Sequence, residues 1–107
     1  MRGTMLTLKV DGTTSRQDFS EMPHISVFQK AVGGYIEVVP HFHSIWFEGK
    51  TESCVAFCNE EGKLRGAPVN PTANVLWQVA AGPKAGRDTL VGDVIVLYGD
   101  DDFMDAL

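Results

Sequence analysis

The alternation of apolar and polar side chains near the start of the chain predicts a β-strand over residues 4–10. Leu6 and Leu8 fall on one face of this segment and more polar residues fall on the other, which is the period of two typical of a half-buried strand. Asp11 and Gly12 follow as a turn signal. We therefore expect the first strand to end at this turn.

A helical pattern follows in residues 21–32, where apolar side chains recur at positions i, i+3 and i+7. Ser20 can cap the first turn with its hydroxyl group. Gly33 suits the left-handed conformation that ends many helices. The pattern predicts a first helix between these two residues.

Short β-rich segments come next, at residues 35–39 and 44–48. Residues 54–58 and 63–65 then resemble the two arms of a hairpin, joined by a four-residue loop. Gly62 in that loop is expected to take a positive φ.

The Asn70-Pro71 pair is a strong signal for the start of a second helix. Asn offers a capping oxygen, and Pro at the first helical position loses only a donor that had no partner. This helix should end near Gly82. We expect an exposed loop over residues 82–88 and a final strand over residues 89–98.

The predicted element order, β-α-β-β-β-β-α-β, indicates an α+β fold with a mainly antiparallel sheet and two helices packed on one face. A chain of 107 residues that is 44% hydrophobic supports a single core. We expect one domain over residues 1–99, followed by an acidic C-terminal tail over residues 100–107.

Net charge narrows the range of partners. The chain carries a net charge of -5, but four of its 14 acidic residues lie in the last eight positions, which leaves 10 acids against 9 bases. This balance supports neither a DNA mimic nor a basic nucleic-acid-binding surface. No apolar run approaches the roughly 18 residues of a membrane span. We expect no membrane insertion.

Two histidines and two cysteines form the best candidate for a metal site. His41 and His43 share a face if extended, as do Cys54 and Cys58. However, residues four apart on a strand lie on the order of 13 Å apart, at about 3.3 Å per residue, so both thiols cannot bind one ion. We expect buried thiols, surface imidazoles and no metal.

No catalytic constellation stands out. The chain has no nucleophile-elbow turn and no glycine-rich phosphate-binding loop, and its glutamates are not spaced as acid-base pairs. We expect neither an enzyme nor a cofactor. A reaction at Cys58 is a distant alternative.

Two blocks of sequence provide the one family resemblance. Residues 33–39 read GGYIEVV and residues 58–70 read CNEEGKLRGAPVN. Over residues 25–98 the chain resembles the family called domain of unknown function 3846, in which a GGYIE block precedes a NEEGKL block and an Asn-containing helix start. Its members are small proteins of bacteriophages, plasmids and mobile elements. The resemblance therefore implies a location in the cytoplasm of a bacterial host cell.

Most letters of these blocks have structural explanations, but some polar ones do not. Asn59 can serve a turn, Asn70 a cap, and Glu37 with Lys63 a cross-strand ion pair. Packing alone does not require these polar side chains, so a role in binding is as well supported as a structural role. The candidates for binding a ligand or partner are Tyr35, Glu37, Asn59, Glu60, Lys63, Asn70 and Trp77.

The segment of residues 42–53 is longer than in the family pattern and is rich in aromatic residues. Some of these must join the core, and the others predict an exposed contact surface that favours a homo-oligomer. The tail is expected to be a frayed terminus, with a partner-binding peptide or a turn packed on the body as alternatives. The partner-contact candidates are His41, Phe42, His43, Trp46, Phe47 and Phe103.

Two functions follow from these observations and the resemblance. The first is a non-enzymatic accessory protein of a phage or mobile element, which binds a host protein and inhibits a host defence. The alternative is a sponge for a small nucleotide signal, held in a pocket at a subunit interface. That pocket would be lined by Tyr35, Asn59, Lys63, Asn70 and Trp77.

Overall fold

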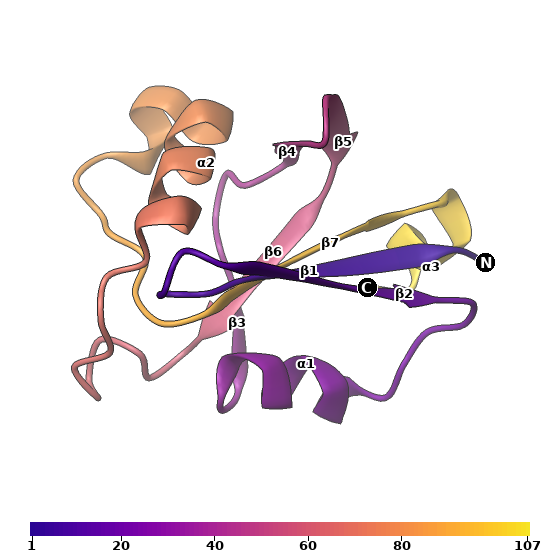
Figure 1. Cartoon of the computed structure of the whole chain (residues 1–107), viewed down its shortest axis with the longest axis horizontal. Coiled ribbons are helices and arrows are strands. Elements are labelled where there is room, and N and C mark those ends of the chain that lie inside the picture. The colour runs from indigo at the N-terminus through magenta and orange to yellow at the C-terminus, as the bar shows by residue number, and fades with distance from the viewer.

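A five-stranded antiparallel sheet forms the centre of the computed structural model, which describes residues 1–107 (Figure 1). The strands follow the spatial order β2-β1-β7-β6-β3. Their bounds are β1 Gly3–Leu8, β2 Thr14–Phe19, β3 Ile36–Val38, β6 Val55–Asn59 and β7 Val94–Gly99. A separate hairpin consists of β4 Ser44–Phe47 and β5 Lys50–Ser53. The helical elements are α1 Ile25–Val32, α2 Pro71–Ala81, the 3-10 turn η1 Gly82–Ala85 and α3 Asp101–Asp105.

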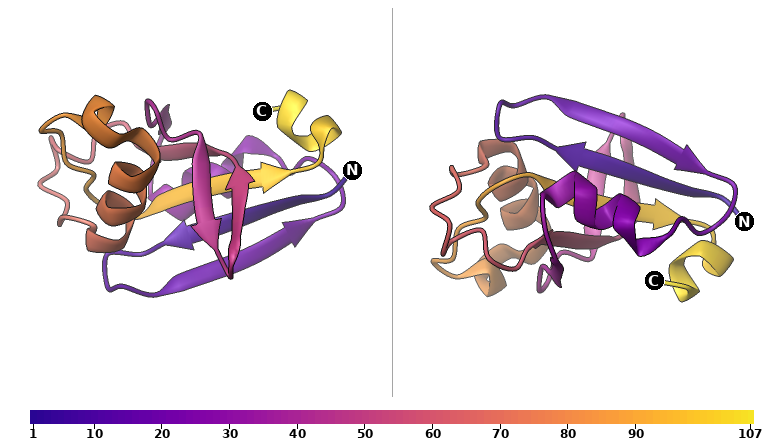
Figure 2. Two further views of the ribbon diagram at one scale, coloured as in Figure 1. Left: turned by 90° about the horizontal axis from the view of Figure 1, so that it is seen from above. Right: turned by 90° about the horizontal axis from the view of Figure 1, so that it is seen from below.

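The predicted α+β class is confirmed, but the placement of both helices on one face was wrong. Figures 1 and 2 show α1 and α2 on opposite faces of the sheet. Leu6 of β1 belongs to the same core cluster as Trp77 of α2, whereas Met5 belongs to the core cluster that contains Phe28 of α1. The reason lies in β7, where residues 94–97 are all fully buried. A central strand that is apolar on both faces needs a cover on each side.

The N-terminal hairpin contains a strand that the pattern did not reveal. The turn at Asp11-Gly12 leads into β2, which pairs with the whole length of β1. β2 is polar and exposed because it forms an edge of the sheet. The first helix consequently starts later than expected, at Ile25, with the His24 imidazole accepting the Ser26 N–H. Its stop at Gly33, with φ of 78°, is confirmed.

The predicted hairpin between residues 54–58 and 63–65 was wrong. β6 pairs instead with β3 on one side and β7 on the other, because it is apolar on both faces. The residues that follow it form consecutive turns. Gly66 takes a positive φ of 65° in these turns, and Gly62 does not.

The second helix begins and ends as predicted. Asn70 accepts the Ala73 N–H at 3.0 Å, Pro71 occupies the first turn, and Gly82 follows the last residue. η1 replaces the first half of the loop expected over residues 82–88. None of the helices, of which α2 is the longest at 11 residues, has the length and hydropathy of a membrane span.

The aromatic segment of residues 42–53 forms the β4–β5 hairpin, which lies beside α2 in Figure 2. Glu48 and Gly49 both have positive φ, 51° and 80°, as the two-residue turn of a tight hairpin requires. Phe42 and Ile45 are buried in the core on the α2 side of the sheet. Trp46 stays 61% exposed.

The acidic tail is an ordered helix, so the expected frayed terminus was wrong. Asp100 caps α3 by accepting the Phe103 N–H at 3.0 Å. The Phe103 side chain is fully buried and joins the core on the α1 side of the sheet. The alternative in which Phe103 packs onto the body is therefore confirmed.

Candidate functional site

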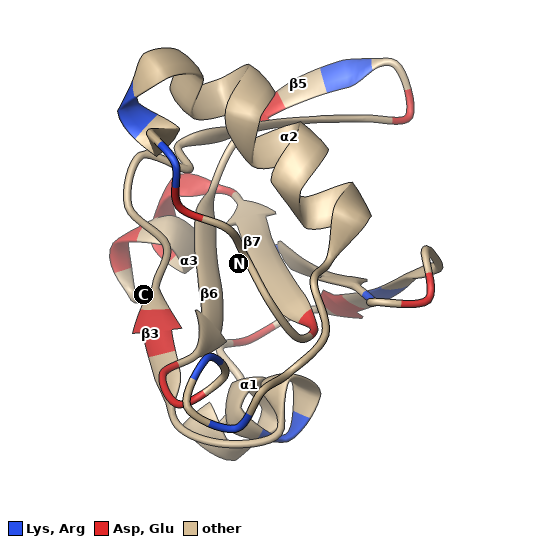
Figure 3. Ribbon diagram, turned by 90° about the vertical axis from the view of Figure 1, so that its left-hand side faces the viewer, with Lys and Arg blue, Asp and Glu red and all other residues tan.

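A cavity of about 210 Å³ lies at the edge of the sheet, where β3 and the end of β6 meet the segment that leads into β7. Of the candidates in the family blocks, it brings together Glu37, Asn59, Glu60, Lys63 and Trp77. Figure 3 looks toward this side and shows acidic positions on β3, after β6 and before β7. The cavity is thus the place where most of the predicted polar residues converge.

The sheet register places the Glu37 side chain on the cavity side. Glu37 of β3 lies directly opposite Cys58 of β6, and neighbouring strands present opposed residues on the same face. Cys58 packs against the core on the α2 side. Trp77 of α2 closes the cavity from within, and its indole N–H donates to the Pro40 carbonyl at 2.8 Å. The rim is therefore acidic and the inner wall apolar.

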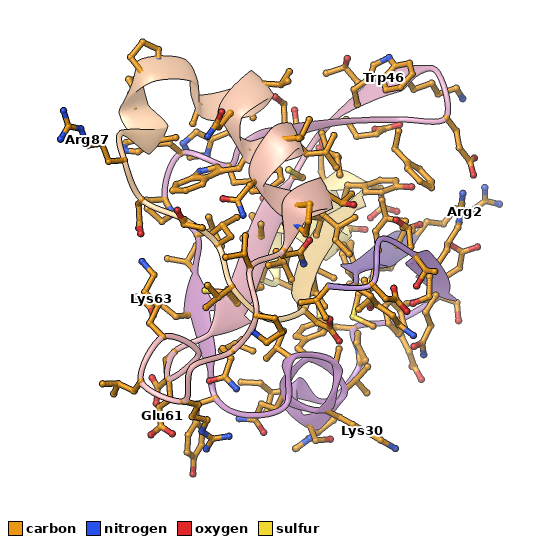
Figure 4. The ribbon with its side chains drawn as sticks, turned by 60° about the vertical axis from the view of Figure 1, so that its left-hand side comes forward. Arg2, Lys30, Trp46, Glu61, Lys63 and Arg87 are labelled. Carbon is orange, nitrogen blue, oxygen red and sulfur yellow. The ribbon has the colours of Figure 1, made fainter.

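Lys63 pairs with Asp88, not with Glu37 as the sequence indicated. This hydrogen bond lowers the pKa of the Asp88 carboxyl below its usual value. Figure 4 shows Lys63 reaching from its turn toward the segment of Arg87. With Glu37 and Glu60 also at the cavity, three carboxylates face a single ammonium group. The site therefore carries excess negative charge.

Two of the binding candidates, Asn59 at the cavity and Asn70 outside it, have structural roles. The Asn59 amide donates to the Val32 carbonyl at 3.1 Å and accepts the Glu61 N–H at 2.8 Å, which ties the turn after β6 to the end of α1. A Cβ atom at Gly34 would lie 2.8 Å from this amide. Asn70 is buried away from the cavity. The pairing of Gly34 with Asn59 explains part of the family signature as scaffold.

Tyr35 is 68% exposed and does not line the cavity. It lines a shallow hollow together with Glu61 and Arg65. No pattern in the sequence pointed to Asp88, which falls in the predicted exposed loop. This residue reaches the cavity only because β7 pairs with β6.

The predicted contact surface is only partly on the outside. His41 and His43 are exposed, with ring centroids 6.3 Å apart and an edge-to-face orientation. Trp46 is exposed and Phe47 is half-buried. The prediction that Phe42 and Phe103 contact a partner was wrong, because both side chains are buried. The exposed part of the predicted surface is thus His41, His43, Trp46 and part of Phe47.

The two thiols are free and are held in their neutral form. Burial raises the pKa of the Cys54 thiol to about 12. Burial, and then the negative charge of Glu37, raise the pKa of the Cys58 thiol, while Lys63 opposes the shift. No group of three or more His, Cys, Asp and Glu side chains is arranged to hold a metal ion.

Slow alkylation of both thiols is the first expected result. At pH 8 Cys54 should react with iodoacetamide at least about 100-fold more slowly than glutathione, because little of it is thiolate. Cys58 is less buried, so its alkylation rate should lie between those of Cys54 and glutathione. Mass spectrometry of timed samples measures these rates, and unfolding in urea should restore both. A native Cys58 that reacts faster than glutathione would contradict this account and support the enzyme alternative.

Comparison with known protein families matches the chain to the family described as a domain of unknown function (DUF3846), over residues 4–106. The match extends beyond the two signature blocks to include nearly all of β1, the whole of β2, and α3. No curated protein and no solved structure matches the chain. Because the matched residues span nearly its whole length, the chain belongs to the DUF3846 family.

Proposed function

We propose that the protein is a non-enzymatic accessory protein of a phage or other mobile element, and that it acts by binding a host protein at the acidic cavity beside β3. The observation that supports this proposal is the convergence of Glu37, Glu60 and Lys63 on one concave site. Exposed polar residues that the fold does not need, gathered beside a hollow, are typical of a recognition surface.

The size and charge of the cavity favour a protein side chain over a nucleotide. Pockets for small ligands commonly measure about 300–1000 Å³, whereas this one measures about 210 Å³. Nucleotide phosphates would be repelled by Glu37, Glu60 and Asp88. A lysine or arginine side chain fits both the volume and the excess negative charge.

The raised thiol pKa of Cys58 supports binding over catalysis. A cysteine nucleophile is activated by a cationic neighbour or a helix start that favours the thiolate. Cys58 lies instead where burial and Glu37 disfavour the charged form. The site is therefore suited to hold a basic group, and not to attack a substrate.

Affinity capture with charge-reversed variants tests the proposal. Tagged protein should recover a stoichiometric partner from a lysate of the bacterial host, and Glu37→Lys with Glu60→Lys should reduce recovery at least about tenfold, because like charges now meet the partner's basic group. The matched control reverses two exposed acids outside the cavity, Glu21→Lys with Asp105→Lys. Failure to recover a stoichiometric partner, or equal recovery by the two double variants, would refute the proposal.

A further inference from the structure

The outer side of β3 is open for hydrogen bonding. The Tyr35 carbonyl accepts the Glu60 N–H at 3.0 Å, and the Val39 N–H donates to the Ala56 carbonyl at 2.8 Å. In an antiparallel strand the backbone N–H and C=O groups of successive residues point alternately to the two neighbouring sides. Since those of Tyr35 and Val39 point toward β6, those of Ile36 and Val38 point away from it. β3 is the last strand of the sheet, as Figure 3 shows. These groups have no strand to pair with.

The two faces beside this edge differ in chemistry. On one face Glu37 lies at the acidic cavity. On the other face Ile36 lines an apolar groove of about 190 Å³, together with Ile25, Phe57 and Leu107. Val38 has the same orientation as Ile36 on the strand and is 55% exposed. A segment beside β3 would thus meet negative charge on one side and apolar surface on the other.

We propose that β3 accepts an extended segment of the partner as a sixth strand of the sheet, with the pattern apolar-basic-apolar. The basic residue lies opposite Glu37 and reaches the cavity, and the two apolar residues lie opposite Ile36 and Val38 on the groove side. Addition of a strand to a sheet edge is a common mode of peptide recognition, in which main-chain bonds give affinity and side chains give specificity. This inference rests on the proposed binding function.

Charge disfavours a second copy of the chain as the occupant. A symmetric antiparallel pair that uses the outward groups of both Ile36 and Val38 places Glu37 directly opposite Glu37 of the other copy. Such a pair has no interstrand hydrogen bonds of its own, so its side chains lie especially close, and like charges directly opposite each other are destabilising. A basic residue of a different protein removes this conflict.

Two synthetic peptides probe the edge directly. We would titrate ¹⁵N-labelled protein with capped Ser-Thr-Val-Arg-Val-Thr-Ser and with the same peptide carrying Glu in place of Arg, up to millimolar concentration. The arginine peptide should shift the Ile36 and Val38 amide resonances and bind at least about tenfold more tightly than the glutamate peptide. Glu37→Lys should invert this preference.

Val38→Pro separates strand addition from simple charge attraction. Proline removes the outward N–H and blocks a neighbouring strand, whereas the bonds of β3 to β6 use other residues. This variant should lose peptide binding, and Val38→Ala, which keeps the N–H, should retain it. Matching amide spectra outside β3 would establish that both variants are folded.

The remaining outcomes overturn the inference in distinguishable ways. Arginine-peptide binding that survives Val38→Pro but is lost in Glu37→Lys would mean side-chain capture without strand addition. Absence of peptide shifts at β3, combined with partner capture that still depends on Glu37, would also reject strand addition while leaving the proposed function intact. A native dimer that Val38→Pro dissociates in sedimentation would assign the edge to a second copy. If the unsubstituted protein neither binds the arginine peptide nor captures a partner, both proposals are rejected.

Discussion

Replacing Asn70 with alanine is expected to lower the free energy of unfolding by about 3–4 kcal/mol. The Asn70 amide donates to the Leu8 carbonyl at 2.7 Å and to the Gly92 carbonyl at 2.9 Å, and its oxygen accepts the Ala73 N–H. Asn70 is fully buried, so no water can replace these bonds. The variant would lose a helix cap and leave three polar backbone groups without this partner.

Urea unfolding followed by circular dichroism measures this loss. Gln78→Ala on the exposed side of α2 is the control, with an expected change within about 0.5 kcal/mol. Since a domain of this size has a total stability of about 5–15 kcal/mol, Asn70→Ala should be visibly less stable. A loss below about 1 kcal/mol would show that neighbouring groups compensate for the two lost amide bonds, and would leave Asn70 with the role of a plain helix cap.

The elements that the sequence predicted correctly are those with local causes. Gly33 ends α1 and Asn70 starts α2 because the required backbone angles and capping groups come from the residues themselves. The turn at Asp11-Gly12 is equally local. These features need no knowledge of the rest of the fold.

The sequence-based predictions were wrong where the structure of a segment depends on which distant segments it packs against or pairs with. β2 has a polar sequence and became a strand because it completes the edge beside β1. β6 has a turn after it that resembles a hairpin loop, but its two apolar faces place it between β3 and β7. The same two-sided burial in β7 separates α1 from α2. Pairing partners and layer assignments are tertiary properties, which single-segment patterns do not contain.

The candidate site was predicted only in part, because some of its residues come together through tertiary packing. Glu37 and Lys63 were singled out because no turn or cap explained them, and both line the cavity. Their expected ion pair was wrong because Asp88, 25 residues beyond Lys63, lies closer to the ammonium group. Asn59 and Asn70 belong to the scaffold that holds the cavity in place.

Removing the Phe103 ring should destabilise the protein as strongly as a substitution in the central sheet. The ring is fully buried and stacks on Phe19, with centroids 6.3 Å apart. It lies against the backbone of Gly3 and Gly99, where a Cβ atom would overlap it. Glycines have no side chains to fill the space that Phe103→Ala would leave. We therefore expect a loss of about 3–5 kcal/mol, the range for large cavities in a core.

Leu107→Ala, at a residue that is 37% exposed, is the matched control and should cost less than about 1 kcal/mol. Urea unfolding monitored by tryptophan fluorescence reports on the far side of the sheet, because Trp77 belongs to the other core cluster. If the urea midpoint of unfolding is lowered in Phe103→Ala but not in Leu107→Ala, α3 and the sheet unfold as one unit. Equal midpoints for the two variants would mean that residues 100–107 detach independently, and the tail would again become a candidate for binding a partner.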